Sequence, residues 1–346
     1  MTPPFLMCHL DTVSILFIIR GTVKILSKRR TIMKKIFIIT GLIFAACALV
    51  TAQNSTALYN EGVTLLAEGQ YQEAVERFKS AAIEDSAHLE ARLGLAQAYY
   101  KLSQWENAEI ALKEALQLDP GNPDALEMAA KVKFKLKKYD DAAKVLETLT
   151  KDTADPGHLS LLGKAYYYAK KRNSAVNAFE RSLENGNENT GDHRKLSSLY
   201  FQNFKQKKNK ADLKRCYEIL DKALEIQEEA ETFYLKGQYA YLAKEPETAK
   251  EALIRAVSLE ASHENALYYL TRTLFQLHEY EEALTYGKQL LMVGKNSKYY
   301  ALLGDICREG GDLENASAFY RQGASYSDKT GQYCAQYLDY LNQPKQ

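Results

Sequence analysis

Apolar residues recur along most of the chain at the three- and four-residue spacing of amphipathic helices, in segments separated by short polar turns. The clearest marker is an alanine with a larger apolar residue four positions later, as in Ala74 with Phe78 and Ala108 with Leu112. After one of these markers the next follows 33 or 34 residues later, with a single step of 41 residues, at Ala142, Ala175, Cys216, Ala249, Ala283 and Ala316. Eight units in phase predict a tandem array of helix-turn-helix repeats.

The composition agrees with a helical array. The chain is 46% hydrophobic and 26% charged, with only 7 Pro and 18 Gly, so it is too apolar for disorder and poor in the turn residues of β-rich folds. Its 24 tyrosines, against one tryptophan, supply rings that pack while each keeps a hydroxyl for water or a ligand. The sequence therefore predicts an all-α fold.

The repeated residues resemble the tetratricopeptide repeat (TPR) family, whose units place small residues where two helices touch and large residues in the remaining space. The pattern is carried in residues 55–88 by Gly62, Gly69, Tyr71, Ala74, Phe78 and Ala81, and in residues 89–122 by Leu95, Ala96, Tyr99, Trp105, Ala108, Leu112, Ala115 and Pro120. The resemblance implies a right-handed α-solenoid of about eight tandem repeats over residues 55–327.

The last repeat of such an array needs a cover for its exposed apolar face. Residues 328–346 are expected to supply a capping helix and a tail. The residues with helical spacing on one face of this segment are Tyr333, Cys334, Tyr337, Leu338 and Leu341.

Two units depart from the family pattern. The fifth has Cys216 in place of alanine and about seven extra residues, rich in lysine, near residues 202–212. Seven residues are close to two helical turns, so the insertion either lengthens both helices or forms a protruding basic loop. The sixth unit has Pro246 after Glu245, which suits the first turn of its second helix.

The N-terminal residues have the pattern of a targeting segment. Residues 33–52 combine Lys34 and Lys35 with an uncharged apolar run and a small-residue cleavage site after Ala52, which is typical of a signal peptide. The apolar run of 15 residues is shorter than the roughly 20 that a membrane-spanning helix needs. Residues 1–32 are interpreted as an upstream extension from a mis-assigned start codon.

The N-terminal segment has a second possible form of processing, which is lipidation. The residues before Cys47 loosely resemble the lipobox of bacterial lipoproteins, with Phe44 where that family prefers leucine, so we favour cleavage after Ala52 over acylation of Cys47. Either way the array is expected to be secreted across the inner membrane of a bacterium, and to be periplasmic or associated with the outer membrane. Membrane contact would come only through a lipid anchor or a partner.

The net charge of the chain limits the classes of binding partner that can be expected. The chain has a formal charge of +1, but removing residues 1–52 leaves 38 basic and 43 acidic residues, a net charge of −5. An acidic body has no global field to attract nucleic acid or an anionic surface, so any basic site must be a local patch. No nucleic-acid partner is expected.

The resemblance implies that the first helix of each repeat lines a concave groove. Aromatic residues recur at one groove position of six successive units, and Lys, Arg or Gln recur beside them. The groove residues predicted from this pattern are Tyr100, Lys101, Lys131, Phe134, Lys135, Lys164, Tyr167, Arg194, Phe201, Gln238, Tyr241, Arg272 and Phe275. Rings beside cationic and amide donors suit an extended protein or peptide segment with acidic side chains. Two alternatives remain open: the rings serve only to pack, or they stack on a glycan or another small ligand.

Motifs of catalysis do not occur in the sequence. It contains no GxxxxGK[ST] loop, no GxSxG elbow and no HExxH pair, and its histidines lack metal-ligand spacing. Cys216, Cys307 and Cys334 are expected to be buried small side chains. The sequence therefore predicts a non-enzymatic interaction scaffold with no catalytic residues, metal or cofactor.

Overall fold

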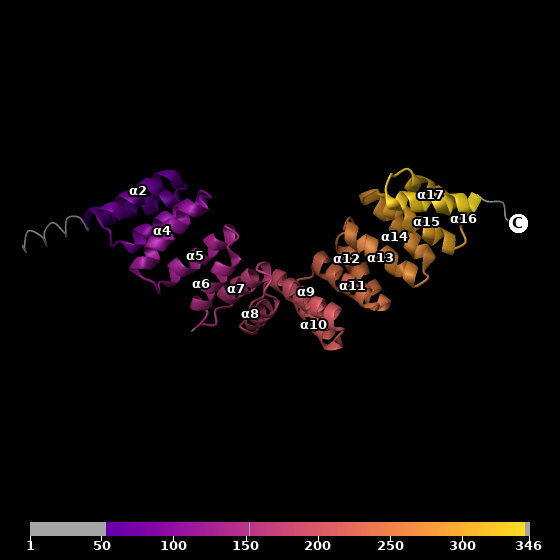
Figure 1. The fold of residues 1–346 in the computed structure, drawn as a ribbon, viewed down its shortest axis with the longest axis horizontal. Helices are drawn as coiled ribbons and strands as arrows, with labels where there is room; N and C mark the ends of the chain where they lie inside the picture. The colour runs from indigo at the N-terminus through magenta and orange to yellow at the C-terminus, as the bar shows by residue number, and fades with distance from the viewer. Residues whose placement is uncertain (1–52, 152, 343–346) are drawn as a thin grey trace, which may run out of the picture. The chain divides into compact units, whose positions relative to one another are not determined.

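The computed structural model describes residues 53–151 and 153–342 (Figure 1). Helices joined by short turns make up these residues, and no β-strand occurs among them. The expected fold class, an all-α solenoid of eight helix pairs followed by a capping helix, is confirmed for this part of the chain. The predictions for residues 1–32, for the signal peptide and for Cys47 lie outside the described residues.

The helices alternate between the first and the second member of a pair. The first helices are residues 53–67, α3 (Leu89–Lys101), α5 (Pro123–Lys135), α7 (Pro156–Tyr168), α9 (Thr190–Lys207), α11 (Ala230–Ala243), α13 (Glu264–Gln276) and α15 (Ser297–Glu309). The second helices are α2 (Tyr71–Glu84), α4 (Trp105–Leu118), α6 (Tyr139–Leu149), α8 (Arg172–Glu184), α10 (Lys210–Ile226), α12 (Pro246–Leu259), α14 (Tyr280–Val293) and α16 (Leu313–Ala324), and α17 (Lys329–Asn342) follows them.

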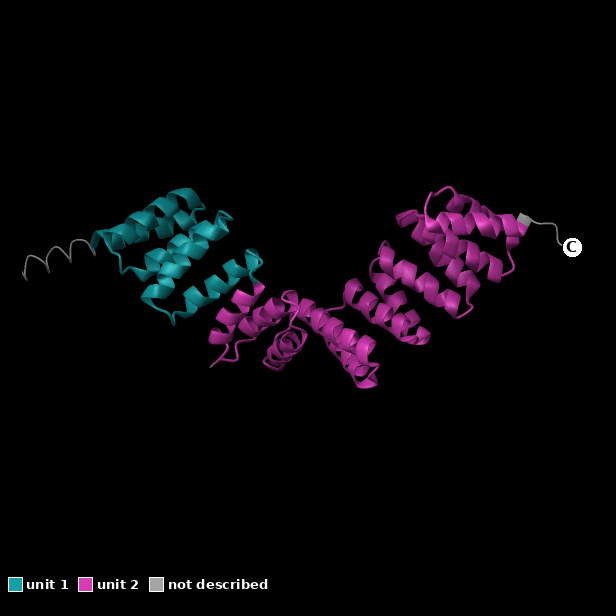
Figure 2. Cartoon of the chain, viewed as in Figure 1, with its two compact units in different colours: residues 1–138 teal, residues 139–346 magenta. Residues whose placement is uncertain are grey.

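The chain divides into two compact units, residues 1–138 and 139–346 (Figure 2). Unit 1 contains the described helices up to α5, and unit 2 contains α6 to α17. The division falls inside the third pair, between α5 and α6, and the other helix pairs each lie within one unit.

Several of these pairs close around a glycine of the first helix. A Cβ atom added to Gly163 would lie 2.6 Å from the Phe179 ring, and one added to Gly304 would lie 2.5 Å from the Tyr320 ring. Real carbon atoms do not approach this closely, so the missing side chain is what lets the two backbones meet. The rings of Phe179 and Tyr320 are completely buried. The small-residue pattern of the sequence therefore marks the helix crossings.

Every turn inside a pair contains one residue with a left-handed backbone. Glycine supplies it in two turns, with φ of 80° at Gly69 and 85° at Gly311. Residues with side chains supply it in the other six, at Ser103, Lys137, Lys170, Lys208, Lys244 and His278. A left-handed residue lets the chain leave one helix and enter the next within two or three residues, at some cost in strain when it is not glycine.

The fifth pair is longer than the others. Helix α9 has 18 residues and α10 has 17, and only Lys208 and Asn209 separate them. Of the two alternatives for the insertion, the structure therefore has the lengthened helices, which lie side by side in unit 2 (Figure 1). Pro246 occupies the first turn of α12, as predicted.

Helix α17 covers the end of unit 2. Cys334 is completely buried against the last helix pair, with Tyr333, Tyr337, Leu338 and Leu341 packed around the same core. The structure contains no helix, among the residues it describes, with the length and apolar character needed to cross a membrane.

Ending the chain at Ser327 is expected to lower the free energy of unfolding of the last helix pair by about 3–5 kcal/mol, because the buried face of α17 is lost. Thermal unfolding followed by circular dichroism measures the effect. A chain that ends at Asn342 is the control and should unfold like the full chain. An unchanged melting curve after truncation at Ser327 would show that α17 is not a cap.

Replacing Lys244 by glycine is expected to raise the free energy of unfolding by about 0.5–1 kcal/mol, since glycine adopts the left-handed conformation without strain. The same replacement at Lys222, an exposed residue inside α10, should lower it by about 1 kcal/mol. Urea unfolding of both variants tests the pair of effects. A loss of stability in Lys244→Gly would contradict the strain attributed to this turn.

Candidate functional site

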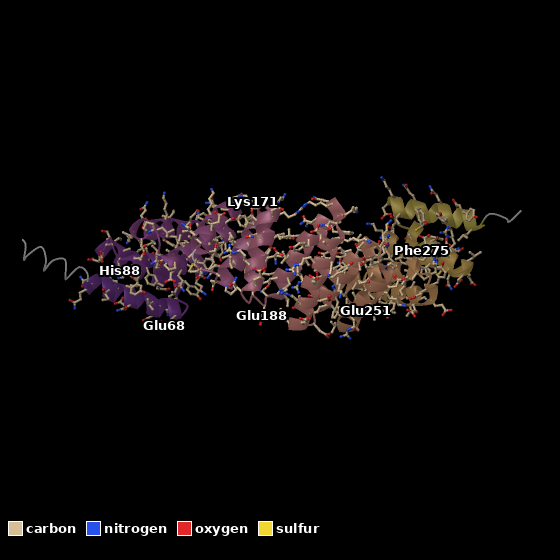
Figure 3. All side chains as sticks on the ribbon, turned by 90° about the horizontal axis from the view of Figure 1, so that it is seen from below. Glu68, His88, Lys171, Glu188, Glu251 and Phe275 are labelled. Atoms are coloured by element: carbon tan, nitrogen blue, oxygen red, sulfur yellow. The ribbon has the colours of Figure 1, made fainter. Side chains whose placement is uncertain are left out.

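The predicted groove residues all lie on first helices, and they fall into both units. Figure 3 shows the side chains along the described helices and labels Phe275 among them. Tyr100, Lys101, Lys131, Phe134 and Lys135 belong to unit 1. The other eight belong to unit 2, on α7, α9, α11 and α13.

In unit 1 the aromatic and basic residues mostly contact one another or a neighbouring acid. The Tyr100 ring meets Trp105 edge to face at 4.9 Å, and the Lys135 ammonium lies 5.7 Å from the Trp105 ring. Lys131 is exposed and forms an ion pair with Glu127, one turn earlier on the same helix. The charge of Lys131 is therefore already neutralised locally.

In unit 2 three first helices line a hollow of about 610 Å³, which we call the Arg272 hollow. Tyr241 comes from α11, Tyr268, Arg272 and Phe275 from α13, and Lys298 and Asp305 from α15. His278 from the turn after α13, Tyr280 from the start of α14 and Thr330 from the start of α17 complete it. Three of the predicted groove residues, Tyr241, Arg272 and Phe275, thus share one concave surface.

Arg272 is held between two tyrosines of this hollow. Its guanidinium lies 5.2 Å from the Tyr241 ring and 5.5 Å from the Tyr268 ring, and Nη1 donates a hydrogen bond to Tyr268 Oη at 3.2 Å. A cation over aromatic faces is stabilised without losing its charge. Arg272 has no carboxylate within ion-pair distance in the described part of the chain. The guanidinium is therefore positioned but not neutralised.

The other charges of the hollow differ in how they are satisfied. Asp305 Oδ1 accepts hydrogen bonds from the hydroxyls of Tyr320 at 2.7 Å and Tyr333 at 2.8 Å. Burial, followed by these bonds to Asp305, raises the pKa of both tyrosines, so the hydroxyls remain donors. Lys298 is exposed and, like Arg272, has no ion-pair partner among the described residues. The hollow therefore presents two cations that its own acids do not neutralise.

A second polar network joins α7 to α9. Asp192 is completely buried, and its Oδ2 accepts hydrogen bonds from Ser160 Oγ at 2.5 Å and Asn187 Nδ2 at 3.0 Å. Its Oδ1 has no hydrogen-bond geometry but lies 3.0 Å from Lys164 Nζ. The predicted groove residue Lys164 thus serves to compensate a buried carboxylate.

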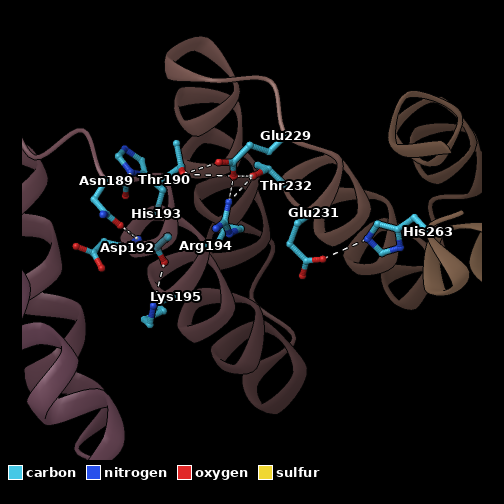
Figure 4. A network of polar contacts seen from close by, with 11 residues as sticks. Asn189, Thr190, Asp192, His193, Arg194, Lys195, Glu229, Glu231, Thr232 and His263 are labelled. Carbon is cyan, nitrogen blue, oxygen red and sulfur yellow. Dashed lines mark hydrogen bonds and ion pairs between the residues drawn. The ribbon is translucent and has the colours of Figure 1, made fainter. Parts of the chain in front are cut away.

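Arg194 and Lys195, on the next turn of α9, have contrasting environments (Figure 4). Arg194 forms an ion pair with Glu229 and donates a hydrogen bond to Thr232 at 3.1 Å. Lys195 contacts the Gly191 carbonyl at 3.5 Å and has no ion pair among the described residues. Burial lowers the pKa of the Lys195 ammonium, Lys164 and Arg194 lower it further, and Asp192 opposes them. Lys195 is therefore a partly buried cation without an ion pair in the described part of the chain.

The remaining predicted groove residues are less accessible to a ligand than Arg272. Phe201 is only 4% exposed and stacks on Tyr239 at 4.2 Å, inside a core with Leu213 and Cys216. The prediction that Phe201 lines an open groove is therefore wrong, because its ring faces are covered. Gln238 donates a hydrogen bond to Tyr234 Oη at 2.7 Å. Tyr167 is half-buried and meets Tyr168 edge to face.

Sequence reasoning did not select four of the residues that shape these sites: Ser160, Asp192, Tyr268 and Lys298. Tyr268 lies one helical turn before Arg272, a spacing that could have indicated the stacked pair. The sequence does not indicate the role of Asp192, since an acidic residue near a helix start is normally explained by the helix dipole.

The cysteine thiols are buried, and two of the histidine rings are engaged in hydrogen bonds at helix starts. Burial raises the pKa of the Cys307 and Cys334 thiols to about 11 and that of Cys216 further, so these thiols stay protonated. His88 and His263 each accept a hydrogen bond from a backbone N–H in the first turn of the helix that follows, that of Ala91 and that of Ala266. Within the described ranges no group of three His, Cys, Asp or Glu side chains is placed to hold a metal ion.

These paired helices, with small residues at their crossings, define an α-solenoid repeat protein. Family models described as tetratricopeptide repeat match residues 59–123, 103–165 and 297–330. A model of subunit 3 of the anaphase-promoting complex (cyclosome) matches residues 209–290. The chain belongs to the tetratricopeptide repeat family.

Relatives with known sequence or structure are repeat proteins as well. The TPR repeat-containing protein MJ1428 of Methanocaldococcus jannaschii is 22% identical over 74% of this chain and 47% of its own length. YpiA of Bacillus subtilis is 31% identical over 33% of this chain and 27% of its own length. The chain thus spans half or less of the length of these relatives. The C-terminal part of a TPR repeat-containing protein of Cytophaga hutchinsonii has the same fold, with a TM-score of 0.58 and 16% identity over 70% of this chain and 98% of that chain.

Replacing Asp192 by alanine is expected to lower the free energy of unfolding by about 2–3 kcal/mol, since Lys164 then loses its counter-charge in a partly buried position. Chemical denaturation measures the loss. Asp141→Ala is the matched control, because Asp141 and Lys144 form an ion pair with both side chains at least half exposed, and it should cost less than about 1 kcal/mol. Equal effects of the two substitutions would contradict a structural role for the buried pair.

Proposed function

We propose that this chain is a non-catalytic scaffold that binds an extended, acidic segment of a partner protein along the first helices of unit 2. Proteins of the tetratricopeptide repeat family are generally protein-interaction scaffolds and typically not enzymes. The observation that carries the more specific proposal is the Arg272 hollow, in which a cation is fixed between tyrosine rings and has no acidic partner among the described residues.

The acidic character of the ligand follows from the charges that the fold leaves uncompensated. Arg272 and Lys298 line the hollow, and Lys195 lies on α9 of the same unit. A carboxylate near any of these cations would gain a charge-assisted hydrogen bond, and it would restore the solvation that Lys195 loses by partial burial. Tyr241 and Phe275 offer apolar surface beside Arg272. Acidic side chains alternating with apolar ones would therefore match this surface.

A glycan ligand is supported less well. Stacking on a sugar ring requires a flat aromatic face that is open to solvent. Tyr239 covers Phe201, and the Arg272 guanidinium lies over Tyr241. The Phe201 ring and one face of the Tyr241 ring are thus occupied by neighbours, which favours a ligand that pairs with the cations.

The leader in the sequence supports a location for this activity. A basic segment, an apolar run and a small-residue cleavage site over residues 33–52 are typical of secretion, so we infer that the array meets its partner across the inner membrane.

Selection of random 12-residue peptides on the immobilised array tests the proposal. We expect the recovered peptides to be enriched in Asp and Glu beside apolar residues, and Arg272→Gln to weaken their binding at least about tenfold because one charge-assisted contact is lost. Fluorescence anisotropy of a labelled peptide measures the affinity. Arg272→Lys should restore part of it by restoring the charge.

The matched control is Arg255→Gln. Arg255, on the second helix α12, also lies over an aromatic ring, 5.6 Å from Phe233, but it already forms an ion pair with Glu228. Its loss should change peptide affinity less than twofold. Peptides without acidic enrichment, or equal weakening by both substitutions, would refute an acidic ligand in the Arg272 hollow.

A further inference from the structure

The lengthened fifth helix pair ends in a concentration of lysines that the groove does not use. Lys205 and Lys207 occupy the last turn of α9, Lys208 forms the turn, and Lys210 begins α10. All four side chains are exposed, as are the residues between them. We call these four lysines the basic tip.

The structure holds the basic tip firmly rather than leaving it as a loose loop. Phe204 and Leu213 extend the core of the fifth pair into the added turns. Arg172, from α8, donates hydrogen bonds to Gln206 Oε1 at 2.7 Å and Gln202 Oε1 at 3.1 Å on the side of α9. The extra turns are therefore packed and braced, and they carry the lysines at the end of a defined hairpin.

The charges of the basic tip are not neutralised within the protein. None of its four lysines has an ion-pair partner among the described residues. Two lysines next to the corresponding turn of other repeats do have one: Lys138 pairs with Glu109 at 2.6 Å, and Lys171 with Asp140 at 2.7 Å. The four charges of the basic tip are therefore left without an ion pair in the described part of the chain.

We propose that the basic tip docks on an anionic phospholipid surface. Four lysines within six residues are a local positive patch on a body whose net charge from residue 53 onward is negative. Such a patch is attracted to a negatively charged bilayer, and the acidic remainder is repelled, so the array would meet the bilayer with this end of the hairpin.

The form of the basic tip favours a bilayer over a folded partner. Lysine ammonium groups are flexible point charges that do not select a bidentate geometry, and they lie at the end of a hairpin rather than in a hollow. A flat surface with many mobile anionic headgroups can meet all four. The Lys208 ammonium lies 5.7 Å from the partly buried Phe204 ring, so no aromatic side chain of the tip is free to insert into the bilayer. The attraction is therefore electrostatic and sensitive to salt.

Vesicle sedimentation tests the proposal with the chain from residue 53 onward, which contains every helix and core described above. The probes are vesicles of phosphatidylcholine alone and vesicles with about one third phosphatidylglycerol, at low salt. We expect binding only to the anionic vesicles, and a loss of at least about tenfold in partitioning when Lys205, Lys207, Lys208 and Lys210 are all replaced by glutamine. Raising the salt to 0.5 M should release the unmodified chain.

A second variant controls for net charge. Replacing Lys113, Lys222, Lys295 and Lys329 by glutamine removes the same four charges from exposed positions spread over the array. This variant should keep its binding to anionic vesicles within about twofold. Circular dichroism of both variants verifies that the helices are intact.

Three results would overturn the proposal: equal binding to neutral and anionic vesicles, equal loss in the two quadruple variants, or binding of the basic tip to soluble polyglutamate but not to vesicles. The last result would assign the basic tip to an acidic protein partner. None of these outcomes bears on the Arg272 hollow, whose peptide binding is measured without lipid.

Discussion

Several helix pairs of the array depend on a missing side chain at one position of the first helix. At Gly163, Gly237 and Gly304 an added Cβ would lie within about 2.6 Å of a large residue of the second helix, so the crossing admits only the smallest residues. This contact fixes how far apart the helices of a pair lie and which face of the first helix remains outside the core. The Arg272 hollow exists because three first helices, α11, α13 and α15, present that remaining face at regular intervals.

Whether a basic residue of this array is available to a ligand depends on whether an acidic residue already pairs with it. Lys131, Lys164 and Arg194 are basic residues of the predicted groove, yet each has an acid beside it within its own unit. Arg272 has aromatic rings in place of an acid. The same side-chain charge therefore contributes to folding at some positions and is left for a ligand at others, and a count of basic residues does not separate the two.

The repeat pattern made the eight pairs, α17 and the position of Pro246 predictable, because each follows from local spacing that a helix converts directly into one face. Contacts between successive repeats were not predictable in the same way. The burial of Phe201 depends on Tyr239, and the role of Lys164 depends on Asp192, residues that are 38 and 28 positions away in the sequence. The insertion near residues 202–212 fitted both alternatives, since the number of added residues is compatible with whole helical turns as well as with a loop.

The buried pair of Lys164 and Asp192 has a consequence for the order of the repeats. Repeats with similar apolar faces of alanine and leucine could pack on one another in more than one order. The Asp192 carboxylate meets Ser160 and Lys164 only when α9 lies against α7, so any other neighbour would leave it a buried charge without its cation. This polar contact thus makes the packing of the two repeats specific, and it disfavours a wrong neighbouring repeat or one exchanged from another copy of the chain.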